Sequence, residues 1–344
     1  MARLSFLGLI RDQRWKVEPV ERADLTGKTV VVVGANVGLG FEAAKHFASM
    51  NPKRLVLGCR SRERGQAALQ AIQATGFKHA ELALVDLSRF SSVSAFADAF
   101  IRDGSQIDIF VYNAAVSLFK YSDTVDGWEE SIQVNHLSAM LLTVLLFPCL
   151  LKAVSSGTSP NPRVVIVSSE LHYWAKFSRK EVESERILRV LNDKEHCTFR
   201  VMATRYHITK LLNVLFVREL AKRLSQNSPV IVNAVNPGYC KSQLRRNMPL
   251  PVRVFDKIME VLIARTTEEG SRQLLWAAVG GAGRESELRG GYVNKANLQD
   301  VSDYALSDEG VLVQRRIWDE SVEVLSRFEP KFQSNLGEIL PSHS

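Results

Sequence analysis

Short apolar runs alternate along the chain with longer stretches in which apolar residues recur at helical spacing. The apolar runs occupy residues 29–34, 54–59, 81–86, 107–113, 163–169 and 231–236. The stretches with helical spacing include residues 39–49, 61–74, 91–102 and 204–224. A strand that is apolar on both sides is typical of a parallel sheet covered by helices on both faces. The pattern therefore predicts an α/β fold with a single doubly wound parallel sheet.

No shift in composition marks a linker between two domains. We therefore expect one domain over residues 26–330, preceded by an extension at 1–25. The Ser-, Gly- and Pro-rich stretch at 155–163 is predicted to be a surface loop. The end of the chain is predicted to form a helix at 308–328 and then a loose tail at 331–344.

Composition argues against a membrane-spanning or secreted protein. With 46% hydrophobic and 24% charged residues over 344 positions, the chain has the composition of a soluble globular protein. The longest apolar run, at 139–151, is shorter than the ~20 residues of a bilayer-spanning helix and contains Pro148. The N-terminal residues MARLSFLGLI are too few for a secretory signal and lack a cleavage site. A shallow membrane contact by this amphipathic start is the less favoured alternative.

Net charge and cysteine spacing narrow the partners further. The net charge of +7 is scattered along the chain without an aromatic-interleaved basic stripe, so we expect a solvated surface and no nucleic-acid partner. The same positive field would draw a phosphorylated cofactor. The four cysteines have no metal-binding or redox spacing, which indicates reduced thiols and a cytoplasmic location. The seven histidines contain no His-x-x-x-His pair, so no metal site is expected.

A glycine-rich loop follows the first predicted strand. In VVVVGANVGLG, Gly34, Gly38 and Gly40 have the spacing G-x-x-x-G-x-G and lead into a predicted helix. Glycine permits a tight turn and lets backbone N–H groups approach a diphosphate at the helix N-terminus. Glycines also serve simply to turn a strand into a helix, but this position in an α/β sheet favours nucleotide binding.

The end of the second predicted strand indicates which dinucleotide binds. In NAD-binding proteins a carboxylate there binds the ribose hydroxyls, whereas this chain has Cys59 followed by Arg60. A guanidinium matches a 2′-phosphate, which a carboxylate would repel. Arg60 therefore favours NADP(H). For Arg62 and Arg64 a solvated helix start is the simpler interpretation.

Two serines end the strand at 163–169, and a Tyr-x-x-x-Lys pair follows on a predicted helix. Tyr206 and Lys210 are four residues apart and so lie on one helical face. A phenol has an ordinary pKa of ~10, so it needs a neighbouring positive charge to act as a base near neutral pH. A serine hydroxyl at an adjacent strand end could bind the substrate oxygen. Each feature alone has an ordinary structural explanation, but together with the glycine loop they indicate a catalytic site.

These motifs resemble the short-chain dehydrogenase/reductase family over residues 27–328, which implies a Rossmann-type fold. The resemblance rests on GANVGLG, VDL, YNAA, VNHLSAMLLT, VVIVSS, YHITK and NPGYCKSQL. Within the family, VNHL, IWDES and the spacing around Tyr206 resemble the retinol-dehydrogenase-like and WW-domain-oxidoreductase-like branch. The N-terminal LIRDQ and ADLTGKTVVVVGANVGLGFEAAKHF are similar to fungal members tied to secondary metabolism.

The resemblance implies catalytic roles for a small set of residues. Tyr206 would donate or accept the proton, and Lys210 would bind the nicotinamide ribose and lower the tyrosine pKa. Ser169 would orient the substrate carbonyl, with Ser168 as the less favoured serine. Asn135 would anchor a water molecule in a proton relay behind the lysine.

The resemblance also implies a cofactor groove. The family places residues 86–87 beside the adenine, residues 113–114 along the groove and residues 237–242 around the nicotinamide carboxamide. The residues expected to bind NADP(H) are Gly34, Asn36, Gly38, Leu39, Gly40, Arg60, Asp86, Leu87, Asn113, Ala114, Tyr206, Lys210, Pro237, Gly238 and Ser242.

The chain departs from the family pattern at several positions. Val33 replaces the usual Thr or Ser, which removes a hydrogen bond that often braces the glycine loop, and NAA replaces NAG at 113–115. Ser169 and Tyr206 are 37 positions apart, because a charged excursion over about 170–198 lies between them. This excursion either shapes specificity beside the substrate mouth or decorates the surface.

Residues 239–265 occupy the position of the family's substrate lid. The lid carries an apolar set at helical spacing, namely Val254, Ile258, Val261 and Leu262. This set could cap a lipophilic substrate or pack a helix on the core, and we favour packing on the core.

The sequence thus predicts an NADP(H)-dependent oxidoreductase that interconverts an alcohol and a carbonyl on a lipophilic small molecule. The resemblance adds a place in fungal secondary metabolism. The main alternative is a nucleotide-binding redox sensor or interaction protein without turnover, which would have no need of the full catalytic set. Family members are often dimers, so a homodimer is left open.

Overall fold

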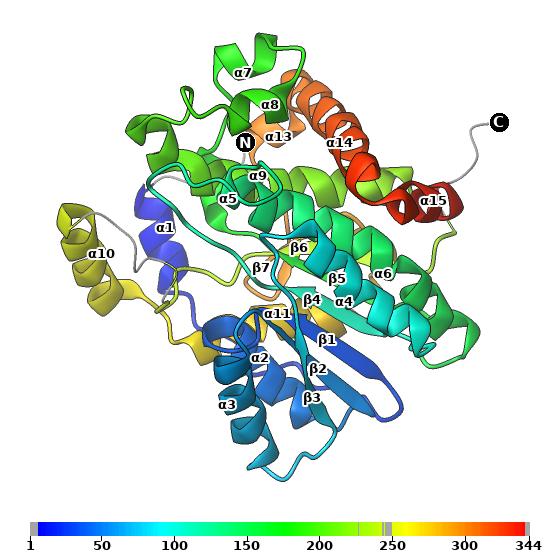
Figure 1. The fold of residues 1–344 in the computed structure, drawn as a ribbon. Coiled ribbons are helices and arrows are strands. Elements are labelled where there is room, and N and C mark those ends of the chain that lie inside the picture. The colour runs from blue at the N-terminus through cyan, green and yellow to red at the C-terminus, as the bar shows by residue number, and fades with distance from the viewer. Residues whose placement is uncertain (1–5, 226, 243, 245–249, 341–344) are drawn as a thin grey trace.

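The computed structural model describes residues 6–225, 227–242, 244 and 250–340. Its centre is an eight-stranded sheet with the order β3-β2-β1-β4-β5-β6-β7-β8 (Figure 1). The strands are β1 (Thr29–Val33), β2 (Arg54–Cys59), β3 (Ala80–Leu84), β4 (Ile109–Tyr112), β5 (Arg163–Val167), β6 (Ile231–Val235), β7 (Tyr292–Asn294) and β8 (Asn297–Gln299). Only the β7–β8 pair is antiparallel in this sheet. The predicted doubly wound α/β fold is confirmed.

The β7–β8 hairpin was not predicted. Each strand has only three residues, which is too short to show a periodic pattern. Lys295 and Ala296 form the turn with φ of 55° and 51°, as a tight two-residue hairpin requires.

Helices cover both faces of the sheet (Figure 1). One face carries α2 (Gly38–Ala48), α3 (Arg62–Gln73) and α11 (Thr267–Val279), and the other carries α4 (Phe90–Arg102), α6 (Ser138–Ser155) and α9 (Phe199–Arg223). The valines of β1 show how the two cores form. Val30 and Val32 pack with the first group of helices, whereas Val31 and Val33 pack with the second, because successive side chains of a strand point to opposite faces.

The remaining helices lie at the ends of the sheet or, like α14 and α15, on the outer side of α9 and α6. They are α1 (Phe6–Gln13), α5 (Glu130–Ile132), a π-helical turn (Gln133–Leu137), a 3-10 helix (Glu170–Trp174), α7 (Arg179–Glu183), α8 (Ile187–Asn192), α10 (Leu250–Ile263), α12 (Glu285–Leu288), α13 (Asp303–Leu306), α14 (Asp308–Phe328) and α15 (Pro330–Ile339). The continuous helical stretch Glu130–Ser155 is long and apolar enough to cross a membrane, but 78% of its apolar window is buried inside the fold. This stretch is therefore the central helix of the core.

Residues 331–340 do not form the loose tail that the sequence predicts, and the rest of that tail, 341–344, lies outside the described residues. α14 occupies the expected helix, but α15 follows it directly, with Phe332, Leu336 and Ile339 buried. Asn335 Nδ2 donates a hydrogen bond to the Val144 carbonyl of α6 at 3.3 Å. The prediction was wrong because α15 has few apolar residues, and their role in packing depends on the surface of α6 that they cover.

The excursion over 170–198 is built into the core. Leu188 and Leu191 of α8 are fully buried, so surface decoration does not describe this segment. The Leu188 N–H donates to Glu320 of α14 at 2.8 Å. Arg205 of α9 is 1% exposed, lies 3.6 Å from Glu129 and donates to the Leu191 carbonyl at 2.9 Å. The excursion thus packs between α9 and α14.

The N-terminal residues are also attached to the domain. Arg265 donates a hydrogen bond to the Asp12 carbonyl at 2.7 Å, and Lys295 forms an ion pair with Asp12 at 2.5 Å. Gln13 and Leu25 are buried. The segment predicted as an extension therefore covers part of the sheet's carboxyl end.

The apolar set of the lid helix α10 does not pack on the core. Val254 and Ile258 are each 54% exposed, and Val261 and Leu262 are more exposed still. The expectation of core packing is wrong because the opposite face of α10 meets the rest of the molecule, through half-buried residues such as Met259.

Candidate active site

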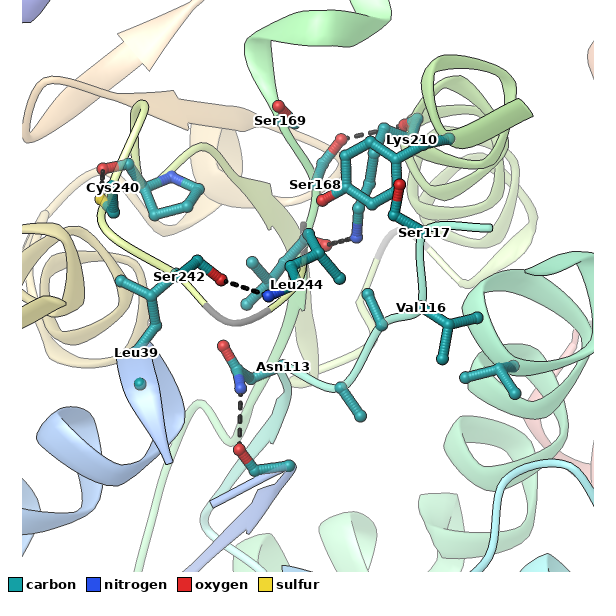
Figure 2. A pocket seen from close by; sticks show the side chains of 18 of the residues that line it. Leu39, Asn113, Val116, Ser117, Ser168, Ser169, Lys210, Cys240, Ser242 and Leu244 are labelled. Carbon is teal, nitrogen blue, oxygen red and sulfur yellow. Dashed lines mark hydrogen bonds between the residues drawn. The ribbon is translucent and has the colours of Figure 1, made fainter. Parts of the chain in front are cut away.

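A cavity of about 600 Å³ opens at the carboxyl ends of the central strands. This is the edge at which doubly wound sheets bind ligands, where β1 and β4 diverge. Of the residues predicted to bind the cofactor or to catalyse, those lining the cavity are Gly34, Asn36, Gly38, Leu39, Arg60, Asp86, Leu87, Asn113, Ala114, Ser169, Tyr206, Lys210, Pro237, Gly238 and Ser242. Figure 2 shows Leu39 and Ser242 on one side of this space and Lys210 and Ser117 on another. Gly40 and Asn135 are not among the lining residues.

The glycine loop provides a surface that a larger residue would fill. Gly34 has φ of 85°, and a Cβ atom there would lie 2.8 Å from the Ala114 backbone. A Cβ atom at Gly40 would lie 2.4 Å from the Gly34 carbonyl oxygen, so Gly40 acts by close packing behind the loop. The residue before α2, Val37, makes no side-chain cap, which leaves the first N–H groups of α2 for another acceptor. The loop therefore fits a diphosphate.

Backbone contacts brace the loop where the family's Thr or Ser is replaced. The N–H groups of Asn113 and Ala114 donate to the Val33 carbonyl at 3.0 and 3.1 Å. The Asn113 side chain donates to the Gly34 carbonyl at 2.9 Å (Figure 2). The β4 end thus holds the β1 end without a hydroxyl at position 33.

The β2 end presents two arginines. Arg60 and Arg64 both line the cavity and are exposed. Ser61 caps α3 by accepting a hydrogen bond from the Arg64 N–H at 3.3 Å, which fixes the first turn of the helix. The sequence favours a solvated helix start for Arg64, whereas the structure places Arg64 on the wall of the cavity. Burial raises the pKa of the Cys59 thiol to about 11, which keeps this position uncharged.

Tyr206 and Lys210 meet in the cavity as their spacing predicted. Lys210 is fully buried, and its Nζ donates to the Val167 carbonyl at 2.7 Å. The same Nζ lies 5.3 Å from the centre of the Tyr206 ring. Burial lowers the pKa of Lys210 to about 7. The lysine is therefore held beside the phenol at the end of β5, where a ligand's charge and hydroxyls can change its protonation.

The two serines at the end of β5 have different environments. Ser168 is 1% exposed and donates its hydroxyl to the Lys210 carbonyl at 2.9 Å. The Ser169 oxygen accepts a hydrogen bond from the Leu171 N–H at 3.2 Å, which leaves its hydroxyl proton for another acceptor. Ser169 is thus the serine whose hydroxyl can serve a bound molecule, whereas Ser168 holds α9 against β5.

Asn135 lies in the π-helical turn behind the cavity wall. Its side chain exchanges hydrogen bonds with the Val116 backbone at 2.8 and 2.9 Å and donates to Thr209 at 3.0 Å. Thr209 precedes Lys210 in α9, so Asn135 joins the segment after β4 to the helix that carries the lysine. A π turn widens the helix locally and is frequent at functional sites.

The substrate side of the cavity contains residues that sequence reasoning did not identify. They include Phe119, Glu170, Leu171, Trp174, Ala203, His207, Tyr239, Leu244, Met259 and Ile263. Ala203 and His207 share the helical face of Tyr206 and Lys210, so spacing alone would have found them. Of the others, Tyr239, Leu244, Met259 and Ile263 fall within the predicted lid over 239–265, and Glu170, Leu171 and Trp174 fall within the excursion over 170–198. The sequence marked these two segments but not the individual residues that line the cavity.

His207 and Trp174 form part of this apolar wall. Their rings are 6.5 Å apart in an edge arrangement. Burial lowers the pKa of His207, so the imidazole is neutral at physiological pH and can donate or accept one hydrogen bond.

A hydrogen-bond network beneath the cavity joins the N-terminal segment to the site. Gln13 donates to the buried Glu170 carboxyl at 3.1 Å, and burial raises the pKa of Glu170 to about 7. Asn236 accepts from the N–H groups of Glu170 and Gly238 at 3.1 and 3.0 Å. This network fixes the residue after Ser169 and the turn after β6 relative to each other.

The fold and site define a dinucleotide-binding α/β protein with a serine, a tyrosine and a lysine converging beside the nucleotide groove. A family model described as short chain dehydrogenase matches residues 28–174. The chain is 33% identical over 333 residues to the short chain dehydrogenase/reductase dmxR8 from Cryptosporiopsis sp. (strain 8999), covering 96% of this chain and 100% of that one. The chain belongs to the short-chain dehydrogenase/reductase family.

Further relatives agree with this assignment. The chain is 37% identical over 276 residues to the short chain dehydrogenase sol3 from Alternaria solani, covering 80% of this chain and 91% of that one. Its fold matches the NADPH-bound carbonyl reductase from chicken fatty liver with a TM-score of 0.57 at 18% identity, covering 80% of this chain and 99% of the other. The chain is thus an oxidoreductase of this family with fungal relatives.

Proposed function

We propose that this chain is an NADP(H)-dependent oxidoreductase that interconverts an alcohol and a carbonyl on a lipophilic small molecule. The observation that carries the proposal is that Ser169, Tyr206 and Lys210, from two separate elements, line one cavity together with the glycine loop. The sequence resemblance implies a step of fungal secondary metabolism, and the fungal origin of the relatives is consistent with it.

Each of the catalytic side chains has a separate role in the proposed reaction. A bound nicotinamide dinucleotide supplies or accepts the hydride. Ser169 donates a hydrogen bond to the substrate oxygen and holds it in place. Tyr206 transfers the proton to or from the same oxygen, and the ammonium of Lys210 favours the phenolate form when the alcohol is oxidised. Asn135 keeps α9 at a fixed distance from the segment after β4.

The preference for NADP(H) rests on the β2 end. Arg60 and Arg64 supply two guanidinium groups there, and the neutral Cys59 stands where NAD-binding proteins have a carboxylate. The NADPH-bound relative of the same fold is consistent with this choice.

The lipophilic substrate class rests on the other wall of the cavity. Trp174, Phe119 and Met259 are apolar, and the neutral His207 is the polar group nearest in sequence to Tyr206. Ser117, Glu170, Tyr239 and Asp256 add polar groups at the same cavity. Such a cavity fits an apolar body that carries a few hydrogen-bonding groups.

The test is turnover. The purified protein is mixed with NADPH and a panel of lipophilic ketones and aldehydes while the nicotinamide absorbance is followed, with Tyr206→Phe as the matched control. Turnover by the natural chain and its loss in the variant supports the enzyme. The reverse reaction is measured with NADP+ and the corresponding alcohols. NADPH binding without turnover in either assay would favour the redox-sensor alternative.

All four cysteines are buried and none of them forms a disulfide, which supports the proposal of a reducing, cytoplasmic location.

A further inference from the structure

The outward face of α10 presents an apolar stripe to solvent. Val254 and Ile258 are 54% exposed, Val261 is 75% exposed and Leu262 is 69% exposed. Their spacing of four, seven and eight residues places all four on one side of the helix. A contiguous stripe of this kind on a protein surface marks an interaction site.

Charge is sorted between the two faces of the same helix. Arg253 and Lys257 are exposed beside the apolar stripe, and the Lys257 side chain is 71% exposed. The acidic residues turn inward. Asp256 accepts a hydrogen bond from Tyr239 at 2.7 Å, and Glu260, which pairs with Lys257 at 2.6 Å, is only 14% exposed. The outward face of α10 therefore combines apolar side chains with two cations and no exposed carboxylate.

The inward face of α10 belongs to the cavity. Met259 and Ile263 line it, and two exposed aromatic side chains lie on elements that line it from the other side. Trp174 is 40% exposed, and Phe199 is 62% exposed one helical turn before the lining residue Ala203. Exposed apolar side chains therefore occur both near the opening of the cavity and on the outward face of α10.

We propose that α10 docks the protein peripherally on the anionic surface of a phospholipid bilayer. The helix lies at the margin of the molecule beside α1 and away from the sheet (Figure 1), and its apolar stripe is exposed to solvent. An exposed apolar helix face flanked by Lys and Arg is the form of an interfacial helix, whose apolar face enters the boundary between headgroups and acyl chains. The cytoplasmic leaflet carries the negative surface potential that these cations match.

This surface differs from the one that the sequence suggested, which was the N-terminal start. α1 is nevertheless next to α10, because Arg265 beyond the end of α10 binds the Asp12 carbonyl. Arg11 of α1 and Arg14, which follows α1, are exposed. A bilayer docked on α10 would hold apolar small molecules next to the rim of the cavity.

A second copy of the chain is a poorer occupant of the stripe. A two-fold contact through α10 would gather the exposed Arg253 and Lys257 of both copies at the margin of one interface. The described part of α10 offers no exposed acid to balance them.

The test is sedimentation with vesicles of phosphatidylcholine alone or of phosphatidylcholine with phosphatidylserine. The natural chain should partition to the mixed vesicles and be released by salt. One cation contributes roughly fivefold, and Lys257 is paired with Glu260, so Arg253→Gln with Lys257→Gln should weaken this binding by about 5- to 30-fold. Val261→Glu with Leu262→Glu should abolish binding to the mixed vesicles. Leu312→Glu, the same change at an exposed position of α14, is the matched control and should bind like the natural chain.

The thermal transition and NADPH affinity of each variant serve as folding controls, because none of these side chains lines the cavity. If the glutamate pair unfolds the protein, Val261→Ser with Leu262→Ser replaces it. Absence of binding to the mixed vesicles at low salt would overturn the proposal, as would unchanged binding by the α10 variants. A concentration-dependent dimer that the same variants dissociate would overturn it in favour of a second copy.

Discussion

The two sides of the cavity are built in different ways. The cofactor side comes from consecutive strand–helix units, with the glycine loop, the β2 end and the β4 end all within residues 34–114. The substrate side is assembled from segments far apart in the sequence, such as Gln13, Glu170, His207 and Met259. The first side depends on local geometry that each unit brings with it. The second depends on tertiary contacts that hold unrelated segments in place.

This difference indicates on which side of the cavity the fold tolerates substitutions. On the cofactor side a substitution should act on one contact and leave the fold unaffected. On the substrate side a substitution should act through the packing of several segments. The predictions below test this contrast, beginning where the two sides meet.

Tyr206 lies where the cofactor side and the substrate side of the cavity meet, so we expect Tyr206→Phe to have the largest effect on turnover. The change removes one hydroxyl from a side chain on α9 without altering the fold. Turnover should fall by roughly 10²- to 10⁴-fold while NADPH affinity is retained. Single-turnover rates and equilibrium binding of NADPH measure the two quantities. A natural rate in the variant, under conditions where the chemical step limits turnover, would remove Tyr206 from the mechanism.

Leu188→Ala tests whether the substrate side depends on the core. Leu188 is fully buried between α9 and α14, so the truncation should lower the free energy of unfolding by about 2–5 kcal/mol. Denaturant unfolding measures the loss. Leu312→Ala, on the exposed face of α14, should change it little. Equal effects of the two substitutions would show that α8 does not form part of the core.

Arg60→Ala with Arg64→Ala tests the local character of the cofactor side. Loss of charge-assisted hydrogen bonds should reduce the preference for NADPH over NADH by roughly 10- to 150-fold in kcat/KM, without a change in the thermal transition. Arg62→Ala is the control, because Arg62 is exposed on the same helix but does not line the cavity. If the natural chain prefers NADH, the assignment of these arginines is wrong.

Glu170→Gln gives the smallest effect and tests the network beneath the cavity. Burial raises the pKa of Glu170 from its ordinary value of 4.5 to about 7, so between these values the folded state binds a proton that the unfolded state does not. This contribution to stability is complete below the unfolded pKa and is lost as pH rises through the folded pKa. The glutamine variant cannot ionise, so its thermal stability relative to the natural chain should increase from about pH 5 to about pH 8. A difference that stays constant with pH would show that Glu170 does not titrate in this range.

The sequence predicted the cofactor side well because its signals are local. Apolar runs marked the strands through β6, and glycine spacing marked the loop whose tight contacts the structure shows at Gly34 and Gly40. Tyr206 and Lys210 were found by helical spacing. The roles of these residues in binding and catalysis stay predictions.

The substrate side could not be predicted because its positions are fixed by packing. Nothing near Gln13 indicates that its side chain reaches Glu170, 157 residues away. The same holds for α8, because its six residues are too few to show a helical period and its partner α14 is far away in the sequence. For α10 the sequence did carry a clear signal, but the signal was misleading. An apolar stripe on a helix normally faces a core, whereas the stripe of α10 faces solvent.

The attachment of α8 to α14 has a consequence for synthesis. Leu188 leaves the ribosome 132 residues before Glu320, the residue that accepts its N–H. At a synthesis rate of roughly 5–20 residues per second, the apolar side of α8 is uncovered for about 7–26 seconds. The sheet from β1 to β5 can form in that interval, but the segment between Ser169 and Tyr206 cannot reach its final packing. Folding of the segment between Ser169 and Tyr206 is therefore complete only after α14 has been synthesised. A nascent chain that stalls before α14 exposes an apolar surface, which chaperones bind, beside an incomplete active site.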